Sequence, residues 1–74
     1  MLEGGNVLIA AGNSGDATLV PRVEALLGDA SPLVRAMAVW ALSRLLDDTA
    51  FEGLMAATTE TDPNVLAEWA SVSA

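Results

Sequence analysis

The chain has 74 residues, which is enough for at most one small domain with a core of marginal stability. Three arginines, no lysine and ten acidic residues give a net charge of −7, which disfavours binding to nucleic acid or anionic lipid. The absence of Cys and His excludes disulfides, thiolate catalysis, Cys-ligated clusters, most zinc sites and the commonest general base.

The chain is also unusually apolar, with 53% hydrophobic residues and a mean hydropathy of +0.46. A free domain of this size rarely exposes so much apolar surface. We therefore expect part of it to meet a partner or the rest of a longer protein.

Residues 1–5 are set apart as an added or linker segment, and the predicted domain covers residues 6–74. The first helix is expected over about 5–13. Its consecutive apolar residues Val7, Leu8 and Ile9 cannot all face one neighbour, so we expect a preceding part of a longer parent to cover the rest. The longest uncharged run, residues 4–15, is short of the ~20 apolar residues that a membrane span needs. No membrane partner is expected, and a cytoplasmic location is compatible with a cysteine-free chain.

The start of the chain has an alternative interpretation. Val7–Ala11 followed by Gly12–Gly15 could form a buried strand and a phosphate-binding loop. The glycine spacing fits neither the dinucleotide fingerprint nor the P-loop, and no lysine follows. A helix ending in a Gly-Asn-Ser-Gly turn is favoured.

Four further helices follow from their start signals, each an Asp or Ser placed before a helix-compatible segment. Pro21 is tolerable only within the first turn of its helix, whereas Pro32 and Pro63 directly follow a cap. The paired acids at 47 and 48 are typical of caps rather than of a metal site. The predicted helices span 17–28, 32–46, 49–58 and 63–72, with caps at Asp16, Ser31, Asp47 and Asp62.

The chain repeats itself. Residues 31–36 return in degenerate form as residues 62–67, and the two prolines are 31 residues apart. A period of roughly 20–50 residues indicates a solenoid, in which each unit buries its apolar face against its neighbours. The fold expected is all-α, with five helices forming about two and a half helical hairpins. Because the helix over 32–46 is apolar nearly all round, it should be the middle layer.

The residues of the central unit resemble a HEAT repeat, in which an Asp and an Arg pair structurally along the stack. Two positions of the third unit depart from that pattern, because Leu66 replaces the Arg and Glu60 stands where Asp29 does. The last half-repeat is therefore expected to be degenerate, as a terminal cap would be. The resemblance is carried by Asp29, Val34, Arg35, Ala38, Ala41, Leu42 and Leu45.

Over about residues 6–46 the chain resembles, more narrowly, the carboxy-terminal HEAT-like extension of the epoxyqueuosine reductases. The Gly-Asn-Ser-Gly-Asp turn at 12–16 is the most particular part of this match. The resemblance implies a non-catalytic module of an iron–sulfur oxidoreductase of queuosine tRNA modification. Such a parent enzyme carries two 4Fe-4S clusters and cobalamin, and its cluster motifs are not in this chain. No catalytic, cofactor-binding or metal residue is assigned here.

The implied partners are the remainder of the parent chain and, in the full-length protein only, tRNA. A generic HEAT adaptor that binds another protein is the alternative. A small helical regulator or a free-standing enzyme is a third interpretation.

Four residues are candidates for interaction. Arg35 could contact phosphate, although pairing with Asp29 is favoured. Arg44 lies about 180° around the helix from Arg35, so the two cannot form one basic patch. Trp40 could anchor an interface or stack with Arg44, four residues on. Asn13 most simply tolerates a left-handed backbone in its turn.

Trp69 is interpreted differently. With Val65 and Val72 it forms a stripe at i, i+4 and i+7 on the last helix. Core packing is therefore favoured over recognition for this tryptophan.

Overall fold

The computed structural model describes the backbone of residues 2–73 and the side chains of residues 8–72. All regular structure in that part of the chain is helical. Residues 7–11 lie within the first helix, so the strand interpretation is wrong and the all-α prediction is confirmed. The elements are α1 (Leu2–Ser14), η1 (Ala17–Leu19), α2 (Val20–Ala25), η2 (Leu26–Gly28), α3 (Pro32–Leu45), α4 (Asp48–Ala57) and α5 (Pro63–Ser73).

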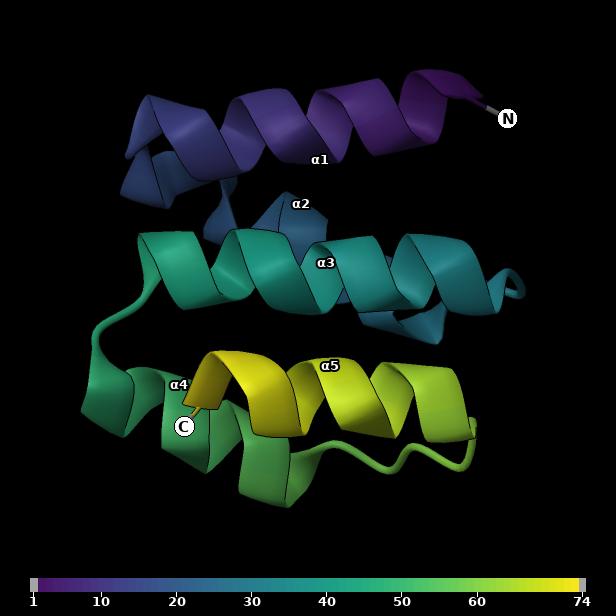
Figure 1. Ribbon diagram of the computed structural model, residues 1–74. Helices are drawn as coiled ribbons and strands as arrows, with labels where there is room; N and C mark the ends of the chain where they lie inside the picture. Colours follow the sequence, from purple (N-terminus) through teal and green to yellow (C-terminus); the bar gives the residue numbers. More distant parts are fainter. Residues whose placement is uncertain (1, 74) are drawn as a thin grey trace.

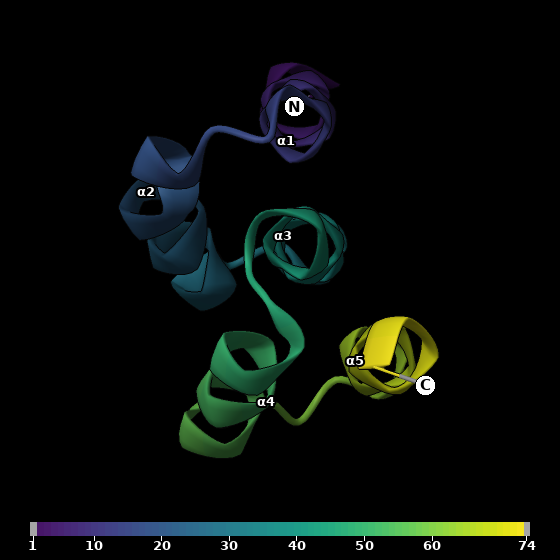
Figure 2. The same ribbon diagram turned by 90° about the vertical axis from the view of Figure 1, so that its left-hand side faces the viewer.

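The helices form two layers. The helices α1, α3 and α5 lie side by side in one layer, and α2 and α4 form the other (Figures 1 and 2). The middle helix α3 contacts α1, α2, α4 and α5. The two ends of the chain lie at opposite ends of the stack (Figure 1). The described residues thus form two complete hairpins, α2–α3 and α4–α5, preceded by the helix α1.

The boundaries of the helices follow the 31-residue period. The helices α3 and α5 begin at Pro32 and Pro63, and α1 and α3 end at Ser14 and Leu45. Equivalent start signals therefore produce equivalent helices in successive units, as the sequence predicts.

The predicted caps make the expected hydrogen bonds. The Ser31 hydroxyl accepts the Val34 N–H at 3.4 Å, and the Asp47 carboxylate accepts the Ala50 N–H at 2.7 Å. The Asp62 carboxylate accepts the Asn64 N–H at 2.8 Å. These bonds satisfy amide groups that a helix start leaves without a partner. No group of acidic side chains within the described residues could hold a metal ion.

The segment 17–28 differs from its prediction as one continuous helix. It consists of a 3-10 turn, the short helix α2 and a second 3-10 turn. Pro21 lies at the start of α2 and has no N–H to donate. The turn before it is closed by tighter bonds, in which Val20 donates to the Ala17 carbonyl.

The glycine-rich segment 12–15 also differs from its prediction. The helix α1 continues through Gly12 and Asn13 to Ser14, and only Gly15 has a positive φ, of 68°. The expectation that Asn13 adopts the left-handed backbone is therefore wrong. Gly15 takes that role because it has no Cβ to clash.

The core is centred on α3 and fills the space between the two layers. Trp69 is 4% exposed, and its ring centroid lies 5.1 Å from that of Phe51. Its prediction as a core residue is confirmed. The side chains with no exposed surface come from three helices and are Leu8, Ala38, Val39, Ala41, Leu42 and Val65.

Candidate functional site

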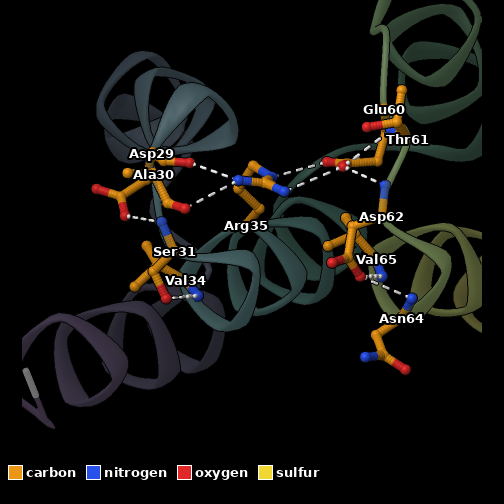
Figure 3. A network of polar contacts seen from close by, with 10 residues as sticks. All are labelled: Asp29, Ala30, Ser31, Val34, Arg35, Glu60, Thr61, Asp62, Asn64 and Val65. Atoms are coloured by element: carbon orange, nitrogen blue, oxygen red, sulfur yellow. Dashed lines mark hydrogen bonds and ion pairs between the residues drawn. The ribbon is translucent and has the colours of Figure 1, made fainter.

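Arg35 links two loops at one end of the stack (Figure 3). Its Nε donates to Glu60 Oε1 at 2.9 Å, and its Nη2 donates to Glu60 Oε2 at 3.3 Å. On the other side, Nη1 donates to the backbone carbonyls of Asp29, at 2.8 Å, and Ala30, at 3.3 Å. The guanidinium therefore joins the loop before α3 to the loop before α5.

Asp29 takes a different part in this network from the one predicted. Its carboxylate accepts the Ser31 N–H at 2.9 Å, and only its backbone carbonyl meets Arg35. The ion pair of Arg35 is made with Glu60 instead. The Arg–acid pair thus connects one repeat unit to the next, which the 31-residue offset between Asp29 and Glu60 could have indicated.

Glu60 is held as a carboxylate. Hydrogen bonding from the Asp62 N–H, and then the Arg35 guanidinium, hold the pKa of Glu60 below its usual range. The side chains of Arg35 and Glu60 are 18% and 7% exposed. The Nε, Nη1 and Nη2 atoms of Arg35 are directed to protein acceptors, which favours the structural role over contact with phosphate.

Two of the other candidate residues, Asn13 and Trp40, lie at an open groove between α1 and α3 that we call the Trp40 groove, whereas Arg44 contacts Trp40 but does not line the groove. Its volume is about 460 Å³. Ile9 and Leu33, at its edges, are 43% and 69% exposed. The groove is lined mainly by Ile9 and Asn13 of α1, Leu33, Met37 and Trp40 of α3, and Glu68 of α5.

Trp40 is positioned from two sides. The Arg44 guanidinium carbon lies 5.8 Å from the centroid of the Trp40 ring, which confirms the predicted local cation–π contact. On the other side, a Cβ at Gly12 would lie 2.5 Å from Cζ3 of Trp40. Only a glycine at this position lets the indole lie so close to α1. The signal missed in the sequence is therefore Gly12, which serves packing and not a turn.

Glu68 gives the groove a negative edge. Its side chain is partly buried, and it makes no hydrogen bond or ion pair with another described residue. A carboxylate next to exposed apolar side chains favours a ligand that carries a positive charge. Sequence analysis did not identify Glu68, since nothing in the chain relates position 68 to positions 13 and 40.

The family model described as HEAT repeats matches residues 5–74. This chain belongs to the HEAT-repeat family. No curated protein and no solved structure matches it significantly. Arg35 and Glu60 therefore pair between successive units of a HEAT array.

None of the described helices is long and apolar enough to cross a membrane. The match supports a helical-repeat module and identifies no reaction.

Proposed function

We propose that this HEAT-repeat chain is a non-catalytic protein-interaction module that binds a partner at the Trp40 groove. The observation that carries the proposal is an exposed apolar groove centred on a pre-positioned tryptophan. Tryptophan is one of the residues that contribute most to protein interfaces. Because Gly12 and Arg44 hold the ring in place, little side-chain entropy is lost on binding.

The chemistry of the groove defines the partner segment. Leu33, Met37 and Trp40 offer apolar surface, and Glu68 offers a carboxylate that no other described side chain pairs with. The partner should insert an apolar side chain and place a Lys or Arg beside Glu68. The net charge of −7 would speed the approach of such a basic segment.

The test is selection of binders from a library of random 12-residue peptides displayed on phage. We expect the selected peptides to combine apolar and basic residues. Trp40→Ala should weaken their binding at least tenfold, and Glu68→Gln should weaken it several-fold with a smaller salt dependence. Leu66→Ala is the control, because Leu66 is 46% exposed but does not line the Trp40 groove. Peptides that bind Trp40→Ala as well as the unchanged protein would contradict the proposal.

A narrower proposal rests on the resemblance of residues 6–46 to the epoxyqueuosine reductases. In this case the chain is the carboxy-terminal module of such an enzyme, and it braces the catalytic part or shapes the tRNA site. The Gly-Asn-Ser-Gly-Asp run at 12–16 supports it. The catalytic part, with its clusters and cobalamin, would then be the partner at the Trp40 groove.

The sequence encoded upstream of this chain distinguishes the two proposals. Two Cys-rich cluster motifs encoded immediately upstream, in frame, are expected for the reductase. An upstream region without them would refute the reductase proposal and leave the adaptor proposal standing.

A further inference from the structure

Met37 brings a thioether to the Trp40 groove. The chain has three methionines and no cysteine, so thioethers are its only sulfur groups that peroxide can oxidise. Met37 is partly buried and lines the open Trp40 groove, whereas Met55 is partly buried and lines a separate groove with Leu66 and Trp69. A small oxidant can therefore reach both residues in the folded chain, and of these two Met37 alone lies at the proposed binding surface.

Met37 is the middle residue of the apolar surface that α3 contributes to this groove. It follows Leu33 by four residues and precedes Trp40 by three, so the three side chains are neighbours on one face of the helix. All three line the groove. A polar group on Met37 would therefore lie in the middle of the surface that receives the apolar side chain of the partner.

The polar side chains Glu68 and Asn13 are not placed to compensate such a group. The helices α3 and α5 lie side by side and run in the same direction (Figure 1), and the 31-residue period places Glu68 at the level of Met37. An ionised carboxylate accepts hydrogen bonds but donates none. The Asn13 carboxamide can donate, but the same period places it at the level of Arg44, seven residues or about 10 Å further along the layer than Met37.

We propose that oxidation of Met37 by peroxide reversibly prevents partner binding at the Trp40 groove, an inference that rests on the function proposed above. Hydrogen peroxide transfers one oxygen atom to a lone pair of the thioether sulfur while its O–O bond breaks, so the sulfur is oxidised to the sulfoxide and the peroxide is reduced to water. Water solvates the sulfoxide oxygen in the free groove. The apolar side chain of the partner would displace that water without replacing its hydrogen bonds.

The test compares Met37→Leu with Met55→Leu, which removes the other partly buried thioether and leaves the groove intact. Both variants and the unchanged protein are treated in the folded state with dilute hydrogen peroxide, which is then removed, and peptide mass mapping locates each added oxygen. A phage-selected peptide without Met or Cys, whose binding Trp40→Ala weakens, is titrated into each chain before and after treatment. We expect oxidation to weaken binding about tenfold in the unchanged protein and in Met55→Leu, and about twofold or less in Met37→Leu.

Two further measurements separate loss of binding from loss of the fold. Methionine sulfoxide reductases should restore the affinity of the oxidised chains. The urea midpoint of oxidised Met55→Leu should show a folded chain under the binding conditions. A chain that oxidation of Met37 unfolds would assign this residue to the core and would overturn the inference.

Three other results would overturn the inference alone. They are a Met37 that peroxide does not oxidise in the folded chain, a peptide that binds the oxidised protein as tightly as before, and a loss of binding that Met37→Leu does not prevent. A selection that yields no peptide dependent on Trp40 is a distinguishable outcome, because it would contradict the proposed function itself and the inference with it.

Discussion

Glu60 shows how a single carboxylate can organise the junction between two repeats. It accepts the backbone N–H groups of Thr61 and Asp62 at 3.1 and 3.0 Å and also pairs with Arg35. The ion pair requires the ionised carboxylate, and the two N–H bonds are stronger when the carboxylate is ionised. The junction should therefore weaken when the carboxylate is protonated.

We predict that Glu60→Gln removes part of the pH dependence of stability. The folded pKa of Glu60 is lowered, first by the Asp62 N–H and then by Arg35, so the unfolded state binds more protons between the two pKa values. The contribution to the free energy of unfolding is complete above the unfolded pKa of about 4.3 and is lost as pH falls through the folded pKa.

Urea midpoints measured between pH 7 and pH 2.5 test this prediction. The difference between the unchanged protein and Glu60→Gln should be largest at pH 7 and shrink at the acid end. Glu52→Gln is the control, because the Glu52 side chain is exposed and has no hydrogen bond or ion pair within the described residues. A difference for Glu60→Gln that stays constant over the whole range would contradict the prediction.

At the scale of the element, α3 is the central helix of the fold, because it contacts α1, α2, α4 and α5. Ala38, Val39, Ala41 and Leu42 of this helix are fully buried. A helix that is apolar nearly all round is stable only when neighbours cover it. Each of the two hairpins and α1 therefore depends on α3 for much of its packing.

Leu42→Ala should cost about 2–5 kcal/mol of unfolding free energy, since it leaves a cavity at a site with no exposed surface. The total free energy of unfolding of a domain of this size is little more than that loss. The measurement is urea denaturation followed by circular dichroism at 222 nm. Leu33→Ala, at a residue that is 69% exposed, should change the free energy by less than about 0.5 kcal/mol. A loss below ~1 kcal/mol for Leu42→Ala would mean that the cavity collapses.

At the scale of the whole molecule, charge limits the choice of partners. Three arginines stand against ten acidic residues. Arg35 is paired with Glu60, Arg44 lies against Trp40, and Arg22 of α2 is the remaining exposed cation. The chain therefore offers no cluster of cations that could neutralise phosphates.

We predict that the isolated chain binds tRNA only weakly, even if a full-length parent acts on tRNA. Phosphate neutralisation supplies most of the affinity for nucleic acids, and this chain provides little of it. Filter binding at ~150 mM salt is the measurement. Repeating it at a tenfold lower salt concentration separates electrostatic binding from other modes, and sub-micromolar affinity at ~150 mM salt would contradict the charge argument.

The sequence by itself determined the period, the starts of α3, α4 and α5 and the all-helical class of this protein. These features depend on local interactions, namely a cap with the first turn of its own helix and an apolar stripe within one helix. The core role of Trp69 followed in the same way. The two errors of local structure, at Pro21 and Asn13, concern a tighter turn before a proline and the choice of Gly15 as the left-handed residue.

Only the tertiary structure decided which acid pairs with Arg35 and which residues share a groove. Glu60 is 25 residues from Arg35, and Glu68 comes to the Trp40 groove from a different helix than Trp40 and Asn13. Such contacts depend on how the layers stack, and the sequence of one helix does not specify its neighbour's rotation. Ala10 and Ala41 are equivalent positions of the repeat, yet Ala10 is exposed and Ala41 is buried. The two helices have similar sequences but differ in what packs beside them.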